Sequence, residues 1–272
     1  MTHPRNLAIG MFDSGVGGLT VLHQLAKRLP NEKIIYFGDT ARVPYGDKSS
    51  QEILRYSIDN ANYLMSKHKI KVLVNACNTS AAYSKLQLRQ LCPMPVVDVI
   101  EAGVKSIVKT TKSQRIAVLG TRATIRSGVY ENEILKLLPQ ATVISIACPL
   151  FVLLVEEQFI GHKATKLIVE EYLAPLKKQN IDALLLGCTH YPLLRGIIQE
   201  ELGNGVAIVD SSSSCAEMVA DLLSSKDLEA PLSSLPVKHQ FFVSDNPERF
   251  AVTARNFLDT QTEVHVQIKS PD

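Results

Sequence analysis

Short apolar segments of strand length alternate with stretches of helical spacing along most of this 272-residue chain. In the clearest helical stretch, Ser49 and Glu52 can form a capping box, and apolar residues from Ile53 to Met65 follow at helical spacing. This alternation is typical of α/β proteins with parallel sheets. The predicted strands are Leu7–Phe12, Lys33–Phe37, Val72–Asn75, Val96–Val97, Arg115–Leu119, Val143–Ile146, Ala183–Leu186 and Val206–Val209.

The eight predicted strands form two sets of four that correspond pairwise at a separation of about 110 residues. The markers at Ala8, Ile34, Cys77 and Val96 correspond to those at Ala117, Val143, Cys188 and Ile208. We therefore predict an α/β fold of two similar doubly wound parallel-sheet domains, related by internal duplication. The linkers between them are expected near residues 98–102 and 207–213.

The tail after Asp210 is too small to be called a domain and is expected to pack on the first half. Its predicted elements are a helix at Cys215–Leu223, a loop at Glu229–Pro236, a strand at Gln240–Val243, a helix at Pro247–Leu258 and a strand at Glu263–Ile268. The first domain then comprises residues 1–98 and 210–272, and the second comprises residues 99–209.

Composition and charge argue against several classes of protein. The net charge is +2, and no basic cluster with interleaved aromatic residues occurs, which argues against nucleic-acid binding. The longest apolar run, Leu150–Val155, is too short to span a bilayer, and the N-terminus has no secretory apolar region. The five cysteines include no CxxC pair, which fits a reducing compartment and argues against a metal site. We therefore expect a cytoplasmic protein without membrane partners.

Two cysteines occur in near-copies of one context, half a chain apart. Cys77 and Cys188 each follow an apolar run that ends in a small residue, and polar residues come next. Ligands of parallel sheets bind beyond the C-terminal ends of strands, so both thiols are expected to face one small molecule in a cleft between the domains. Inverting a carbon next to a carboxylate needs a base on one face and an acid on the other. Thiols with a pKa of about 8.5 can supply both.

Other polar residues lie close to the expected strand ends. His190 follows Cys188 by two residues and can stabilise a thiolate or hold its proton. Asp13 follows the first strand in a glycine-rich turn whose N–H groups can face an anion. Of Glu156 and Glu157, one can face the cleft and the other solvent. The hydroxyl and amide groups suited to bind carboxylates are Ser14, Asn78, Thr79, Thr121 and Thr189.

The order and spacing of several motifs resemble the cofactor-independent glutamate racemases over nearly the whole chain. The motifs are Phe12–Leu19, Gly38–Gly46, Ala76–Thr79, Gly120–Thr124, Cys148–Val152, Leu186–Pro192, Val209–Ser211 and Val243–Pro247. The resemblance implies interconversion of L- and D-glutamate without pyridoxal phosphate or any other cofactor, to supply D-glutamate for peptidoglycan. Members of this family are often dimers, which implies a homodimer here.

The same resemblance implies roles for individual residues. Cys77 is expected to act on the D isomer with help from Asp13. Cys188 is expected to act on the L isomer with help from His190, and Glu156 is expected near His190. The implied substrate contacts are Asp13, Ser14, Tyr45, Gly46, Asn78, Thr79, Thr121, Thr189 and His190.

Three further details refine the resemblance. His190 favours glutamate over aspartate, because the related aspartate racemases typically have Glu at this place. Leu153 stands where the family often has Pro, and it is expected to shift the strand end near Glu156. The chain begins at Met1 without the extension that family members regulated by a cell-wall precursor often carry, so this regulation is not expected.

Three alternatives stay open at this point. The same scaffold could racemise aspartate or a related acid with the same two thiols. It could also bind a small anion without turnover. In a redox role Cys77 and Cys188 would pair with each other, which requires Cα atoms within about 7 Å.

Overall fold

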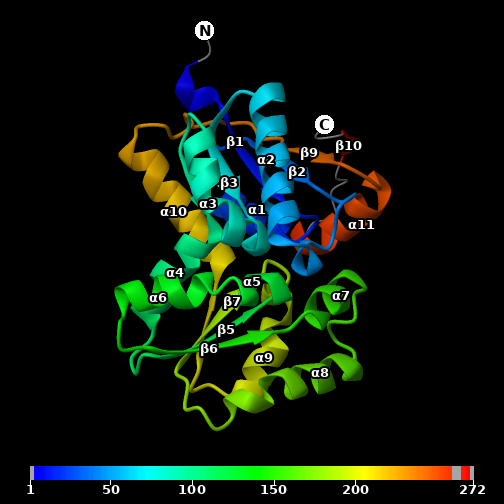
Figure 1. Cartoon of the computed structure of the whole chain (residues 1–272). Helices are drawn as coiled ribbons and strands as arrows, with labels where there is room; N and C mark the ends of the chain where they lie inside the picture. Colours follow the sequence, from blue (N-terminus) through cyan, green and yellow to red (C-terminus); the bar gives the residue numbers. More distant parts are fainter. Residues whose placement is uncertain (1–2, 259–264, 270–272) are drawn as a thin grey trace.

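The strands of the protein form two separate parallel sheets (Figure 1), in a computed structural model that describes residues 3–258 and 265–269. The first sheet has the order β10-β9-β2-β1-β3-β4, and each neighbouring pair runs parallel. Its strands are β1 (Ala8–Asp13), β2 (Ile34–Gly38), β3 (Ile70–Asn75), β4 (Val96–Asp98), β9 (Gln240–Val243) and β10 (Val266–Ile268).

The second sheet has the order β6-β5-β7-β8 and is also parallel throughout. Its strands are β5 (Arg115–Gly120), β6 (Thr142–Ala147), β7 (Ala183–Gly187) and β8 (Ala207–Asp210). This order repeats β2-β1-β3-β4 of the first sheet strand for strand. The prediction of two similar parallel α/β halves is therefore confirmed.

Helices cover both faces of the first sheet. Successive side chains of a strand point to opposite faces, so Ile9 and Met11 of β1 join the core under α1 and α11, whereas Ala8 and Phe12 join the core under α2 and α3. The predicted cap of α2 is present, because the Ser49 hydroxyl accepts a hydrogen bond from the backbone N–H of Glu52. The helices are α1 (Leu19–Arg28), α2 (Ser50–Lys67), α3 (Asn78–Leu91) and α11 (Pro247–Leu258).

The second half carries shorter helices around its smaller sheet. They are α5 (Arg122–Arg126), α6 (Val129–Leu137), α7 (Leu150–Glu156), α8 (Lys163–Leu173) and α9 (Arg195–Leu202). The strand end expected near Glu156 is wrong, since these residues belong to helix α7. Phe151 and Val155 are buried four positions apart, while Leu153 is exposed, which is helical periodicity and not the alternation of a strand. None of the helices in the described residues has the length and apolar character that a membrane span requires.

The segment after helix α10 (Ser211–Ser225) extends the first sheet, because β9 pairs with β2 and β10 pairs with β9. A buried ion pair between Lys71 and Glu32 fastens the loop that leads to β9. The Lys71 ammonium donates to the carbonyl of Leu228, and Glu32 accepts from the N–H of Ala230. Residues 263 and 264 of the predicted last strand lie outside the described residues. The division into domains of residues 1–98 with 210–272, and 99–209, stays a prediction that this pairing supports.

The predicted linkers are regular structure instead. Residues 98–102 begin helix α4 (Val99–Thr110), and residues 207–213 contain β8 and the start of α10 (Ser211–Ser225). Helix α10 begins at Ser211 and not at the predicted Cys215, because the Asp210 carboxylate caps it by accepting the N–H of Ser213 at 2.9 Å. Helices α4 and α10 pack on each other where the two halves meet (Figure 1), so paired helices join the halves.

Candidate active site

A cavity of about 330 Å³ opens at the C-terminal ends of strands from both sheets. The predicted site residues that line it are Ser14, Tyr45, Gly46, Cys77, Asn78, Thr79, Thr121, Glu156, Cys188, Thr189 and His190. The predicted residue Asp13 is absent from the wall and is buried at the end of β1. A larger groove of about 690 Å³ lies between α1, α4 and α10 and contains none of these residues.

The Cys77 thiol lies at the junction of β3 and α3. Its sulfur caps the helix by accepting the N–H of Ser80 at 3.4 Å, and it contacts the Ser14 hydroxyl at 3.5 Å. Burial, together with the charge of Asp13, raises the pKa of the Cys77 thiol to about 12. This thiol therefore holds its proton at neutral pH, despite the favourable dipole of α3.

The Asp13 carboxyl lies at the end of β1, and no cationic side chain of the described residues forms an ion pair with it. One of its oxygens accepts the N–H of Gly15 at 2.8 Å, and the other, Oδ1, is buried without a hydrogen-bond partner among the described residues. Burial raises the pKa of Asp13, and the attraction of His190 opposes this shift. A raised pKa makes this carboxylate a stronger base than an exposed aspartate, which suits it to accept a proton.

The Cys188 thiol has a different neighbourhood. Its sulfur lies 3.8 Å from Nδ1 of His190, and Nε2 of the same ring lies 3.0 Å from Oε1 of Glu156. Burial alone lowers the pKa of His190, but the hydrogen bonds with Cys188 and Glu156 outweigh burial and raise it to about 10. Burial raises the pKa of Glu156, but the hydrogen bond with His190 outweighs burial, and the pKa of this carboxyl is lowered. The ring is therefore an imidazolium at neutral pH.

The choice between the two adjacent glutamates is settled by their partners. Glu156 faces the cavity and bonds to His190, whereas Glu157 forms an exposed ion pair with Arg249 of α11 at 2.8 Å. Because Glu156 ends α7, consecutive residues there point in different directions around the helix axis.

The glycine-rich turn after β1 allows the two halves to approach closely. A Cβ built on Gly17 would lie 2.5 Å from the His190 ring and would also collide with Thr189. A Cβ on Gly46 would lie 2.9 Å from Cβ of Thr121. These glycines therefore bring loops of the first half against the strand ends of the second half.

Hydroxyl and amide groups from both halves line the wall between the thiols. The hydroxyls of Thr79, Thr121 and Thr124 form a triangle with sides of 2.9, 3.2 and 3.0 Å. The Asn78 side chain lies at the first turn of α3, and its Nδ2 is buried without a partner among the described residues. Donors of this kind are suited to bind a carboxylate.

The Tyr45 hydroxyl points away from the cavity. It donates to the buried carboxylate of Asp39 and accepts from Nδ2 of Asn60 at 3.1 Å. Tyr45 therefore offers the cavity its ring and backbone, in the short helix η2 (Tyr45–Asp47), and its hydroxyl fixes that helix in place.

Thr124 and Tyr130 contribute hydrogen bonds to the site and were not predicted. Thr124 completes the hydroxyl triangle, and Tyr130 of α6 donates to Oδ1 of Asn78 at 2.5 Å. Thr124 stands within a quoted motif, so the motif carried a signal for it. Tyr130 follows no strand end and belongs to no motif, so the sequence carried no signal for it.

Comparison with known proteins gives consistent matches. A sequence model described as Asp/Glu/hydantoin racemase matches residues 14–219. The chain is 44% identical over 250 residues to a glutamate racemase of Syntrophus aciditrophicus, covering 92% of each chain. The structure is similar to a glutamate racemase of Bacillus anthracis, with a TM-score of 0.93, 36% identity and 98% coverage of each chain. It is also similar to a glutamate racemase of Francisella tularensis in complex with D-glutamate, with a TM-score of 0.91, 38% identity, and coverage of 98% of this chain and 99% of that chain.

Proposed function

Because this chain belongs to the Asp/Glu/hydantoin racemase family and is an amino-acid racemase, we propose that it interconverts L- and D-glutamate without a cofactor, using two thiols. The family resemblance of its motifs is confirmed by the comparisons. The observation that carries the proposal is that Cys77 and Cys188, which follow corresponding strands of two sheets, line one cavity. The matched relatives are glutamate racemases, and one of them has D-glutamate bound, which supports glutamate as the substrate.

The proposed reaction moves two protons across one carbon. From L-glutamate, the Cys188 thiolate removes the α-proton, and the electron pair of the broken C–H bond delocalises into the adjacent carboxylate. The Cys77 thiol then donates its proton to the opposite face of the carbon, which gives D-glutamate and leaves a thiolate. The reverse reaction uses the same two groups in exchanged roles. This assignment of isomers to thiols rests on the family resemblance.

The neighbours of each thiol support its proton transfers. His190 is an imidazolium beside Cys188, so it stabilises a thiolate there and can return a proton to it. Asp13, whose pKa is raised by burial, can receive the proton that Cys77 must lose before it acts as a base. We propose Cys77 and Cys188 as the acid/base pair, with Asp13, His190 and Glu156 assisting.

The carboxylates of glutamate need donors between the two thiols. We propose that they bind Ser14, Asn78, Thr79, Thr121 and Thr189, together with the segment at Tyr45 and Gly46. The first turn of α3 adds backbone N–H groups and the positive end of a helix dipole. Such donors favour the negative charge that the α-carboxylate gains as the proton leaves.

The use of the product follows from the motif resemblance alone. We propose that D-glutamate made by this enzyme supplies peptidoglycan synthesis, and that the enzyme is a homodimer. Light scattering during size-exclusion chromatography tests the dimer, which a monomeric mass at working concentration would contradict.

Proton NMR tests the activity itself. Purified protein free of pyridoxal phosphate is incubated with L-glutamate in D₂O, and the α-hydrogen signal and optical rotation are followed together. We expect both to disappear, because each inversion exchanges the α-proton for solvent deuterium. L-Aspartate is the matched control and should keep both. Turnover of aspartate with retention of the glutamate signal would contradict glutamate as the substrate.

A further inference from the structure

The side-chain amide of Asn78 is held at only one of its two ends. Asn78 follows Cys77 directly and lines the cavity, and it is 2% exposed. Its Oδ1 accepts a hydrogen bond of 2.5 Å from the Tyr130 hydroxyl, while its Nδ2 is buried without a partner among the described residues. A buried donor without a partner is unfavourable, and a ligand oxygen would satisfy it.

The Tyr130 ring is itself fixed by the strand that leads to Cys188. Tyr130 is 2% exposed, and a Cβ built on Gly187 would lie 2.8 Å from its ring edge. The ring therefore packs against the residue that precedes the second thiol. Gly187 precedes Cys188, and Asn78 follows Cys77. The hydrogen bond from Tyr130 to Asn78 therefore links the surroundings of the two thiols across the boundary of the two halves.

The direction of this hydrogen bond decides what the amide offers. An amide has an acceptor oxygen and a donor nitrogen, and only the nitrogen can bind a carboxylate. Burial raises the pKa of the Tyr130 phenol well above its ordinary value, so the phenol keeps its proton and can donate it to Oδ1. With Oδ1 occupied, the NH₂ group is the end of the amide left for a ligand.

We propose that Tyr130 is a positioning residue for substrate recognition: by holding Oδ1 of Asn78, it presents Nδ2 to a carboxylate of glutamate. The inference rests on the proposed function, and it deepens that function by assigning the recognition of one carboxylate to a pair of residues from opposite halves. Substrate then binds to an amide that is already oriented, which avoids the cost of ordering it on binding.

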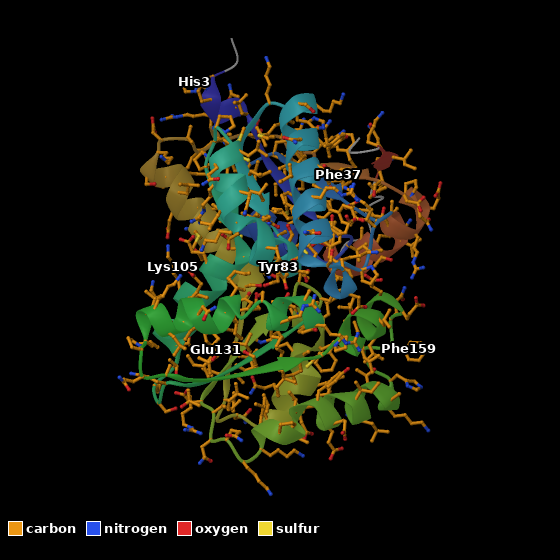
Figure 2. The ribbon with its side chains drawn as sticks, in the orientation of Figure 1. His3, Phe37, Tyr83, Lys105, Glu131 and Phe159 are labelled. Atoms are coloured by element: carbon orange, nitrogen blue, oxygen red, sulfur yellow. The ribbon has the colours of Figure 1, made fainter. Side chains whose placement is uncertain are left out.

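A second tyrosine provides a matched control. The hydroxyl of Tyr83 on α3 also crosses between the halves, donating to the carbonyl of Ala123 at 2.9 Å, but its acceptor is a backbone group that does not line the cavity. Tyr83 lies near the boundary of the two halves in Figure 2. Loss of either hydroxyl removes one bond between the halves, whereas only the Tyr130 hydroxyl orients a group in the cavity.

The test compares Tyr130→Phe, Tyr83→Phe, Asn78→Ala and the double variant Tyr130→Phe/Asn78→Ala in both reaction directions. We expect Tyr130→Phe to raise KM for both isomers about tenfold, as loss of one oriented hydrogen bond would. kcat should change less than KM, because the carboxylate is bound in the ground state and the transition state alike. Tyr83→Phe should leave KM near the wild-type value. In the Asn78→Ala background, Tyr130→Phe should cause no further rise.

Three kinetic results would overturn the inference: an unchanged KM in Tyr130→Phe, an equal rise in Tyr83→Phe, or a full further rise in the Asn78→Ala background. If wild-type enzyme does not turn over glutamate, the proposed function fails and this inference fails with it. If wild-type enzyme is active and Tyr130→Phe behaves like wild type, only the inference fails.

A measurement on the wild-type protein covers the case in which Tyr130→Phe does not fold. With ¹⁵N-labelled asparagine, the side-chain NH₂ resonances of Asn78 should shift when D-glutamate is added. A titration to saturation that leaves these resonances in place would overturn the inference.

Discussion

The two thiols follow equivalent strands, but their surroundings differ in charge. Cys77 lies near Asp13, a buried carboxyl with one oxygen unpaired, and the pKa of the thiol is raised to about 12. Cys188 lies beside His190, which Glu156 holds as an imidazolium with a pKa of about 10. One thiol therefore has a proton acceptor in its vicinity, and the other has a cation.

This difference separates what the duplicated fold repeats from what each half supplies alone. The strand order and the position of each thiol repeat, because they are properties of the backbone. The proton partners do not repeat, since Asp13 ends β1 of one half, while His190 follows β7 and Glu156 ends α7 of the other. The two sides of the cavity can thus invert the same carbon by chemically different routes.

Removal of either thiol gives the largest expected effect. We expect Cys77→Ser and Cys188→Ser each to lower racemisation by about 10²–10⁴-fold, because a serine hydroxyl is too weakly acidic to replace a thiolate base. kcat/KM must fall equally in both directions, since the two isomers of glutamate have equal free energy. The comparison of the two sites therefore requires a different measurement from the racemisation rate.

Deuterium exchange without inversion supplies that measurement. Cys188→Ser keeps Cys77 and should exchange the α-proton of D-glutamate in D₂O but not that of L-glutamate, and Cys77→Ser should show the reverse preference. Proton NMR on each pure isomer measures both. Exchange of both isomers by both variants at similar rates would contradict the assignment of one thiol to each face.

The two carboxyl groups should affect stability in opposite directions. The pKa of Asp13 is higher in the folded state than its ordinary value of 3.8. As the pH rises above 3.8, the unfolded chain therefore loses the carboxyl proton first, and Asp13 lowers the free energy of unfolding. Asp13→Asn cannot ionise and should raise the free energy of unfolding at pH 7 by about 1–3 kcal/mol. Glu156→Gln removes the negative charge that faces His190 and should lower the free energy of unfolding by roughly 1–3 kcal/mol.

Urea unfolding at pH 7 measures both changes, and racemisation is assayed in parallel. Both variants should lose activity, so a gain of stability in Asp13→Asn would separate its effect on the reaction from any loss of fold. A lower free energy of unfolding in Asp13→Asn would contradict the prediction that burial of the Asp13 carboxyl destabilises the protein.

Local patterns were sufficient for the strands and the thiols. Parallel strands are buried on both faces and appear as continuous apolar runs, and in both halves the strand before the thiol is fully buried. Helix α4 was missed and the predicted start of α10 was four residues late, for a reason that can be read in the chain. Asp98 and Asp210 cap α4 and α10, but each follows a short apolar strand, so a linker between domains was the simpler interpretation.

Contacts across the chain account for what the sequence could not predict in the site. Tyr130 reaches Asn78 over 52 residues, and Glu156 reaches His190 over 34. The first pair forms only where the two halves meet, and the second only after α7 packs beside the loop that follows β7. Neither periodicity nor capping signals encode such pairs. The choice between Glu156 and Glu157 was open for the same reason, because it depends on how α7 packs.

The smallest expected effect is the pH dependence of the interaction between Glu156 and His190, on the Cys188 side. The folded pKa of His190, about 10, exceeds the ordinary 6.5, so its contribution to stability is fully present below pH 6.5 and is lost as pH rises through about 10. Glu156 has a lowered pKa, so its contribution is present above 4.5 and is lost as pH falls below that value. The difference in unfolding free energy between wild type and Glu156→Gln should therefore be largest between pH 4.5 and 6.5 and decline towards pH 10.

Glu157→Gln is the matched control and should show little difference at any pH, because its ion pair with Arg249 is exposed. A constant difference across this range would mean that the carboxyl of Glu156 stabilises the protein by packing, without its charge interaction with His190.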